Sequence, residues 1–240
     1  MKAYFKLADI VVEATFQYEY LLKQCKDYCI KDPVSVDMEV VVDADDLARE
    51  KASGMDGSFP DYYIESLAFY RKFAQKAIAF DCILFHGSAL SIDGECFLFG
   101  APSGTGKSTH SALYRKVFGD RVVMVNDDKP LIRRKGDIFY VYGTPWNGKH
   151  RLSNNISVPL KGLCFLKQGS ENVIRPLSIF EALSASLSQI YRPEQVKAYK
   201  GILSFTRDMV TRIHAFELVC TISKEAAELS YRTMKGAQSQ

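Results

Sequence analysis

The residues best suited to chemistry lie in a short glycine-rich segment that directly follows an apolar run. Residues 96–99 are Cys-Phe-Leu-Phe, and residues 100–109 then read GAPSGTGKST. This segment matches the phosphate-binding pattern of Gly, four residues and Gly-Lys-Ser/Thr, except that Ala101 takes the first glycine position. A chance glycine-rich turn is the alternative, but the order of strand, loop, Lys-Ser and helix disfavours it. The sequence therefore predicts a phosphate-binding loop.

Each part of that loop has a physical task in holding a polyphosphate. Glycines let the backbone form a nest of inward-pointing N–H groups, and the N-terminus of the following helix adds its positive dipole end. We expect Lys107 to reach the β- and γ-phosphates and the Ser108 hydroxyl to ligate Mg²⁺. The residues predicted to bind the nucleotide are Ser103, Gly104, Thr105, Gly106, Lys107, Ser108 and Thr109.

A pair of carboxylates follows the next apolar strand, about twenty residues after Lys107. Asp127 and Asp128 follow the run 121–125, with Asn126 between them and the run. The carboxyl ends of neighbouring strands meet at one edge of an α/β sheet, so we expect this pair beside the glycine-rich loop. One carboxylate would serve Mg²⁺ and the other would accept a proton from an attacking hydroxyl. Taken alone the pair is more typical of a solvated turn, but its position after the loop favours a functional role.

Two further segments carry side chains that suit a phosphate-handling site. His86-Gly87 ends the apolar run 83–85, and local grounds leave a structural or a functional histidine open. Residues 143–151 hold the only Trp and the consecutive residues Lys149, His150 and Arg151. These side chains would close over the transferred phosphate or bind an acidic substrate, and a solvated basic turn is the equal alternative. Lys129 and the cluster 133–135 are interpreted as a solvated strand edge or turn.

The elements that must position these residues follow from hydrophobic periodicity. Residues 3–16 and 34–42 alternate like strands, residues 18–30 suit a short helix, and residues 61–80 have helical spacing. Asp93-Gly94 joins two apolar runs and predicts a hairpin that leads into the loop. Further strands are expected at 121–125, 131–132, 138–142, 162–166, 173–176 and 214–219, and helices at 108–117, 178–191, 193–212 and 223–234. A break at 53–58 predicts a small N-terminal unit over 1–58 and a catalytic domain over 59–240.

Composition narrows the classes of protein. The 240 residues carry 31 Lys+Arg and 28 Asp+Glu, and the net charge of +3 gives little support for nucleic acid or an anionic membrane as partner. No apolar run approaches the ~18 residues that span a bilayer. The six cysteines are scattered and typical of reduced thiols, so we expect a cytoplasmic protein. Cys25 and Cys29, four apart, would share a helix face, but a metal site there lacks further ligands.

The combination of His86-Gly87, Ser103 to Ser108 and Asn126-Asp127-Asp128 resembles the HPr kinase/phosphorylase and ATP-dependent phosphoenolpyruvate carboxykinase superfamily. The resemblance covers roughly residues 80–170 and is closest to compact HPr-kinase-like serine kinases. It implies an α/β fold with a P-loop core of this type, a mixed β-sheet flanked by helices, and here a small α+β N-terminal unit. The C-terminal signature of true HPr kinases is not recognised, and carboxykinases are about twice as long.

The resemblance also implies roles for individual residues. Lys107 and the backbone of Gly104 to Ser108 would bind the triphosphate of ATP, and Ser108 and Asp128 would hold Mg²⁺. Asp127 would be the general base, and His86 would lie in the catalytic pocket. Arg151 or Lys149 would stabilise the charge of the γ-phosphate.

Two functions are therefore carried forward. The first is a Mg²⁺/ATP-dependent kinase acting on a hydroxyl of serine in free, peptide or protein form. The alternative is a nucleotide-binding regulatory module without turnover, and a nucleic-acid kinase has little support. The expected partner is a serine-bearing small molecule, peptide or protein, with no nucleic acid and no membrane. The sequence leaves the oligomeric state open, a homo-oligomer included.

Overall fold

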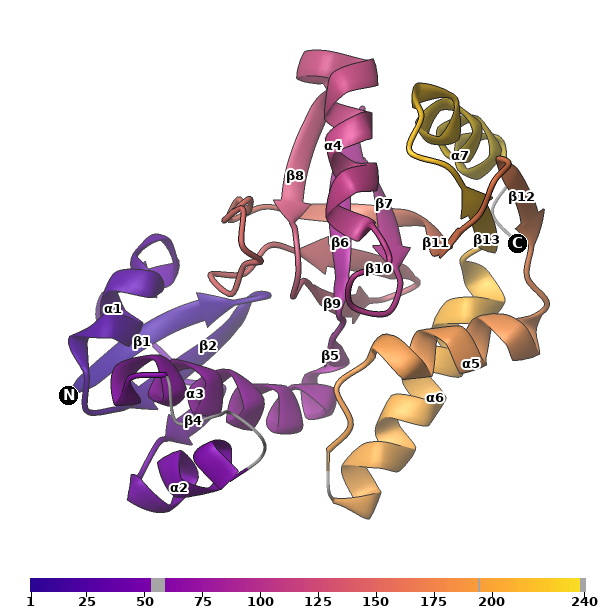
Figure 1. Cartoon of the computed structure of the whole chain (residues 1–240). Coiled ribbons are helices and arrows are strands. Elements are labelled where there is room, and N and C mark those ends of the chain that lie inside the picture. Colours follow the sequence, from indigo (N-terminus) through magenta and orange to yellow (C-terminus); the bar gives the residue numbers. More distant parts are fainter. Residues whose placement is uncertain (53–58, 194, 238–240) are drawn as a thin grey trace. The chain divides into compact units, whose positions relative to one another are not determined.

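The computed structural model in Figure 1 describes residues 1–52, 59–193 and 195–237. Contacts divide the chain into two compact units, Met1–Phe80 and Asp81–Gln240. The boundary predicted after residue 58 falls at the end of segment 53–58, which lies outside the described residues. The contact-based division comes later in the chain, so the helix that follows this segment groups with the N-terminal strands.

The N-terminal unit is a four-stranded sheet with three helices. Its strand order is β3-β1-β2-β4. The bounds are β1 Lys2–Leu7, β2 Ile10–Thr15, α1 Glu19–Gln24, β3 Cys29–Ile30, β4 Met38–Val41, α2 Ala44–Ala52 and α3 Asp61–Ala77. Aromatic contacts such as Phe5 with Phe69, whose ring centroids lie 5.9 Å apart, join the sheet to α3.

Two predicted elements of this unit need correction, and a third element was not predicted. The single strand expected over 3–16 is a hairpin, because Ala8 and Asp9 adopt left-handed φ values of 49° and 58° and reverse the chain. The helix expected over 18–30 ends at Gln24, so Cys25 caps it while Cys29 belongs to β3, and the two cysteines do not share a helix face. Helix α2 was not predicted; its charged residues hide the apolar periodicity of a short helix.

The unit Asp81–Gln240 is built on a nine-stranded mixed sheet flanked by helices (Figure 1). Strands run in the order β5-β9-β10-β11-β7-β6-β8, with β13 paired to β11 and β12 paired to β13. The strand bounds are β5 Cys82–Leu84, β6 Gly87–Ile92, β7 Glu95–Gly100, β8 Val122–Asn126, β9 Leu131–Lys135, β10 Ile138–Tyr142, β11 Ser157–Gln168, β12 Val173–Pro176 and β13 Ala215–Cys220. The helices are α4 Lys107–Phe118, α5 Ile179–Gln189, α6 Val196–Arg212 and α7 Lys224–Gly236.

Strand direction brings the chemically interesting segments to one edge of this sheet. β11 pairs with β7 and β13 in parallel, and β8 is parallel to β7 because each is antiparallel to β6. The carboxyl ends of these strands therefore meet at the edge where β6 begins. The predicted hairpin is confirmed, with Asp93 and Gly94 at left-handed φ values of 53° and 80°. β6 lies between β7 and β8, so the acidic strand is one place further from the loop strand than the sequence predicted.

The core of this unit supports the helix that follows the loop. Phe97 and Phe99 of β7, Tyr114 of α4 and Met234 of α7 are almost fully buried in one apolar cluster. Burial of such side chains contributes ~1.5–3 kcal/mol each, so the base of α4 is firmly held. Among the described residues, no helix combines the length and apolar character needed to cross a membrane.

Candidate active site

The glycine-rich loop (residues 101–106) joins the end of β7 to the start of α4. Gly104 and Gly106 have φ values of +80° and +116°, which residues with a side chain rarely adopt. A Cβ at either position would meet nothing within 4 Å, so backbone conformation and not space requires glycine there. Ala101 does not have a positive φ and is buried. The loop geometry is therefore compatible with alanine at the pattern's first position.

Lys107 begins α4 and turns back onto the loop. Its Nζ donates to the carbonyl of Ala101 at 2.6 Å and to that of Pro102 at 3.4 Å, and only 8% of the residue is exposed. Burial lowers the pKa of Lys107, while the negative charge of Asp128 opposes that shift. A phosphate in the loop would have to draw the ammonium away from these carbonyls. Among the other predicted nucleotide ligands, Ser103, Gly104 and Thr109 are exposed and Thr105, Gly106 and Ser108 half-buried.

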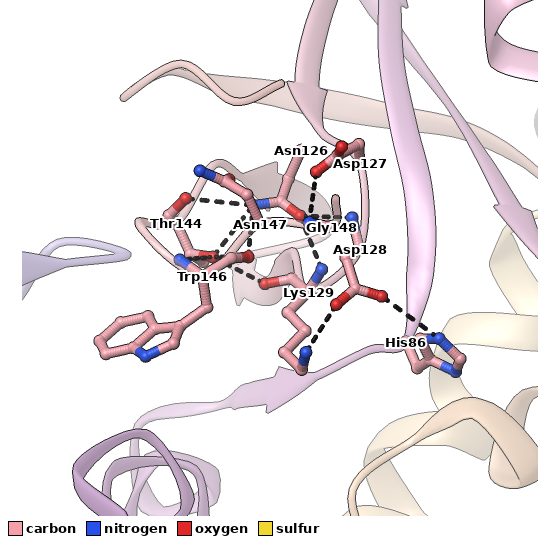
Figure 2. A network of polar contacts seen from close by, with 9 residues as sticks. All are labelled: His86, Asn126, Asp127, Asp128, Lys129, Thr144, Trp146, Asn147 and Gly148. Carbon is pink, nitrogen blue, oxygen red and sulfur yellow. Dashed lines mark hydrogen bonds and ion pairs between the residues drawn. The ribbon is translucent and has the colours of Figure 1, made fainter. Parts of the chain in front are cut away.

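The acidic turn (Asn126–Lys129) follows β8 and is organised by a fully buried asparagine. Asn126 Oδ1 accepts from the backbone N–H groups of Asp128 at 2.8 Å and Lys129 at 2.6 Å. Its Nδ2 donates to Thr144, to the carbonyl of Trp146 at 3.2 Å and to Asn147 (Figure 2). An asparagine side chain that captures the N–H groups just after itself builds a turn without help from the sheet. The turn and the 144–147 segment are therefore locked together.

Asp127 has one satisfied and one unsatisfied carboxylate oxygen. Oδ1 accepts from the Gly148 N–H at 2.8 Å, whereas Oδ2 is buried without a hydrogen-bond partner. Only 5% of the residue is exposed. A buried carboxylate oxygen without a donor is costly, and such groups are retained where a ligand or proton completes them. A Cβ at position 148 would lie 3.3 Å from Oδ2, so glycine leaves this oxygen its room.

Asp128 is engaged through both oxygens. Oδ1 lies 3.3 Å from His86 Nε2, and Oδ2 accepts from Lys129 Nζ at 2.6 Å (Figure 2). Burial alone would raise the pKa of this carboxyl, but the His86 hydrogen bond and the Lys129 charge hold it well below its usual range. Asp128 is therefore ionised. Lys129, interpreted from sequence as solvated, is instead its partner because the turn directs its side chain back to the carboxylate.

His86 reaches the site because β6 starts at the same edge. Gly87 lies opposite Gly100 in the β6–β7 ladder, and its N–H donates to the carbonyl of Asp128 at 2.9 Å. A Cβ on Gly87 would lie 2.7 Å from the Phe99 carbonyl, so only glycine allows this approach. The structure thus brings His86, Asp127 and Asp128 together, and the charge of Asp128 acts on Lys107.

The segment 143–156 is attached to β8 at both ends. Beyond the contacts of Asn126 and Asp127, Asn154 donates through its backbone to Val125 and through Nδ2 to the carbonyl of Met124. Between these attachments the Arg151 N–H donates to the Gly148 carbonyl at 3.0 Å, closing what we call the basic turn (Gly148–Arg151). Arg151 has a φ of +53°, unusual for a side-chain-bearing residue. Its exposed side chain forms no hydrogen bond to the other predicted site residues.

Sequence reasoning missed Gln189, at the end of α5. The N–H of His86 donates to its main-chain carbonyl at 2.7 Å. In the amide orientation that satisfies its neighbours, its side-chain nitrogen donates to the carbonyls of Ala101 at 3.0 Å and His86 at 3.1 Å. Gln189 thus ties the loop to the His86 segment. A lone glutamine in an ordinary helix gives no sequence signal. Asn126, by contrast, is visible in the sequence as part of the run Asn126-Asp127-Asp128, but its hydrogen bonds to the 144–147 segment are not.

Two cavities adjoin the glycine-rich loop. One, of about 510 Å³, lies between Gly104–Gly106, the first turns of α4 and the ends of β11 and β13, with Leu113, Leu166 and Ile222 in its wall. The other, of about 1030 Å³, is lined by Ala101–Thr105, α5 and the ion-paired residues Lys167, Glu217, Arg175 and Glu181. Both volumes suit small-molecule binding. No cluster of three or more His, Cys, Asp or Glu side chains that would hold a metal is found among the described residues.

Comparisons with known proteins show the family to which this chain belongs. The model of the family described as "SynChlorMet cassette protein ScmC" matches residues 66–233, more than two thirds of the chain. No curated protein matches this chain. Among solved structures, the Hpr(Ser) kinase/phosphatase from Coxiella burnetii is 14% identical, with a TM-score of 0.32, and the match covers 64% of this chain and 99% of that one. That likeness is too weak to transfer an activity. On the extent of the family match, the chain belongs to the ScmC family of SynChlorMet cassette proteins.

Proposed function

We propose that this protein is a Mg²⁺/ATP-dependent phosphotransferase that moves the γ-phosphate to a hydroxyl group of a serine-bearing acceptor. The observation that carries the proposal is the buried, unpartnered Oδ2 of Asp127 at the same sheet edge as the glycine-rich loop. A general base needs an oxygen that no protein donor already occupies, and a phosphate donor must be bound nearby.

The loop supports the donor half of the proposal. The left-handed Gly104 and Gly106 suit a backbone nest for phosphate oxygens, and Lys107 supplies a cation at the start of α4. In this role Lys107 exchanges its two loop carbonyls for the phosphates. The smaller cavity beside Gly104–Gly106 offers an apolar wall for the nucleoside, on the β11–β13 side of the loop and away from His86.

The residues at the site could hold a magnesium ion if the phosphates of bound ATP supply the rest of its coordination shell. Mg²⁺ is commonly held by one or two carboxylates together with substrate phosphates and water, and no larger acidic cluster is needed. Ser108 and the ionised Asp128 would be the protein ligands, with the ion competing against Lys129 for Oδ2. When bound, the ion would supply electrostatic stabilisation of the charge that develops on the phosphate oxygens.

The chain's own groups then divide the transfer among them. Asp127 Oδ2 takes the proton of the acceptor hydroxyl, and the hydroxyl oxygen of the acceptor forms a bond to the γ-phosphorus. The bond from that phosphorus to the β–γ bridging oxygen breaks, and ADP leaves. Gly148 fixes the carboxylate through Oδ1, so that Oδ2 keeps its direction. His86 pairs with Asp128 Oδ1 and restricts the orientation of that carboxylate.

Replacing the proposed base without changing its shape tests the function. We expect Asp127→Asn to lower phosphoryl transfer by roughly 10²–10⁴-fold, the usual worth of a general base. The assay is transfer of labelled γ-phosphate to serine, serine peptides and serine-bearing small molecules, with MgATP affinity measured alongside. Lys107→Ala is the matched variant and should lose nucleotide affinity instead. Full transfer by Asp127→Asn contradicts the base assignment, and tight MgATP binding without any product supports the regulatory-module alternative.

A further inference from the structure

The basic turn (Gly148–Arg151) occupies a defined position relative to the proposed base. Its first residue donates its N–H to Asp127 Oδ1 at 2.8 Å, and a side-chain atom added at that residue would touch Oδ2. The segment that carries the turn is bound to β8 before it, through Asn126, and after it, through Asn154. The turn is therefore a rigid neighbour of the acidic turn.

The three side chains that follow Gly148 have no partner within the described chain. Lys149, His150 and Arg151 are exposed and form no hydrogen bond or ion pair through their side chains. The left-handed φ of +53° at Arg151 shows that the turn is held by its surroundings against a local preference. A rigid backbone that presents two unpaired cations beside a buried carboxylate is suited to binding an anion.

The position of the turn indicates which anion it would meet. Asp127 accepts from Gly148 of the basic turn, whereas Asp128 pairs with His86, whose neighbour Gly87 lies opposite Gly100 at the end of β7. Figure 2 shows Asp128 between His86 and the 144–148 segment. The basic turn therefore adjoins the Asp127 side of the acidic turn, which holds the proposed base for the acceptor, while Lys107 serves the donor phosphates at the glycine-rich loop.

We propose that the acceptor carries a carboxylate close to its hydroxyl, and that Lys149 and Arg151 of the basic turn bind this carboxylate while the hydroxyl meets Asp127. This inference rests on the proposed function and narrows its acceptor to hydroxy acids. A carboxylate fits better than a phosphate, because a single charge repels the neighbouring γ-phosphate less than a double charge does. The carboxylate would come either from a free hydroxy amino acid or from an acidic residue beside serine in a peptide.

Direct binding with matched probes tests the proposal. The probes are L-serine against L-serinamide, and a blocked Gly-Asp-Ser-Gly peptide against its Asn counterpart, titrated calorimetrically into the full chain with Mg²⁺ and a non-hydrolysable ATP analogue. We expect the acidic member of one pair to bind at least about tenfold more tightly, the weight of one charge-assisted hydrogen bond. The pair that shows the preference identifies the source of the carboxylate.

The variants separate a local contact from net charge. In Lys149→Gln/Arg151→Gln the preference should vanish, while Lys197→Gln/Lys200→Gln, with the same charge change on exposed residues of α6, should keep it. The proposal is overturned if no acidic probe binds more tightly than its neutral partner, or if both double variants behave alike. It is also overturned if the turn variant loses affinity for the ATP analogue instead, because the turn would then serve the γ-phosphate. Failure of the unmodified chain to bind the analogue is a separate result that contradicts the proposed function itself.

Discussion

The two halves of the candidate site differ in how firmly they are held. The acidic turn is fixed by a fully buried asparagine that bonds both to the turn and to the 144–147 segment. The glycine-rich loop has exposed residues at 102–104, and Thr105 makes only long contacts with Pro102 and Gln168, both at 3.3 Å. Its strongest contact is that of Lys107 with the Ala101 carbonyl.

The difference indicates that the acidic turn would be in place before substrate binds, whereas the glycine-rich loop would rearrange when it binds phosphate. Groups that handle a proton gain from being fixed before substrate arrives, because misplacement is costly. A loop that wraps phosphates must exchange internal contacts for contacts with the ligand. In this protein the exchange centres on one carbonyl, that of Ala101, which both Lys107 and Gln189 approach.

The largest effect should come from breaking the rigid half. In Asn126→Asp a carboxylate oxygen replaces Nδ2, so the Thr144 and Trp146 carbonyls lose their donor and face a buried charge. We expect the free energy of unfolding to fall by about 3 kcal/mol, the sum of several unsatisfied buried groups. Chemical denaturation at pH 7 measures this loss. Asn147→Asp, whose side chain meets Asn126 only at 3.4 Å, is the control and should change stability by less than about 1 kcal/mol. Equal losses would contradict the central role of Asn126.

A second effect tests the apolar support beneath the loop. His110 of α4 packs on Phe99 and Tyr114 and is 3% exposed, and burial lowers its pKa to about 4. The unfolded histidine takes up a proton below about pH 6.5 but the folded one only near pH 4, so stability is complete above that window and falls as the pH falls through it. Between pH 7 and pH 5 the loss should be about 2 kcal/mol by denaturant unfolding. The His110→Gln variant should not show this loss of unfolding free energy between pH 7 and pH 5. The same pH dependence in the variant and in the unmodified protein would refute the assignment to His110.

The smallest effect concerns the adaptable half. When phosphate draws Lys107 away, the Ala101 carbonyl depends on Gln189, so Gln189→Leu should weaken MgATP-analogue binding by about tenfold. Fluorescence titration measures the affinity, and thermal unfolding without nucleotide shows whether the empty protein changes as much. Gln195→Leu, at an exposed position before α6 whose side chain makes no capping hydrogen bond, is the control and should leave the affinity unchanged. A Gln189→Leu variant that binds normally, or loses empty-state stability by the same amount, would contradict this positioning role.

Much of the fold of residues 81–240 was predictable, because its elements are long and their signals local. Asp93-Gly94 marks the hairpin, and alternation and helical spacing locate the strands and helices that follow. The N-terminal unit was predicted less well. Its short elements, such as β3 and α2, carry too few residues for a periodicity to be recognised, and the turn at Ala8-Asp9 has no glycine to mark it.

The candidate site likewise has features with a local sequence signal and features without one. The loop pattern and the acidic pair were visible in sequence, and the nucleotide, magnesium and catalytic roles drawn from them stay predictions. Three features of the site were not visible in the sequence, because each depends on how the chain is folded. They are the partner of Asp128, the carboxylate oxygen of Asp127 that has no hydrogen-bond partner, and the role of Gln189. The Arg151 side chain is exposed and forms no hydrogen bond or ion pair within the described residues, and its backbone has a left-handed φ of +53°; this motivates the acceptor-side proposal.

Some local conformations follow directly from the residue types in the sequence. Gly104 and Gly106 allow left-handed backbone, and Asn126 builds its turn from the N–H groups that follow it. These effects are local, so they are encoded within a few residues. The tertiary structure decided which of the two aspartates is free and which is paired. That difference arises because β6 enters between β7 and β8 with His86 at its start, while Gly148 comes from a separate segment to cover Asp127.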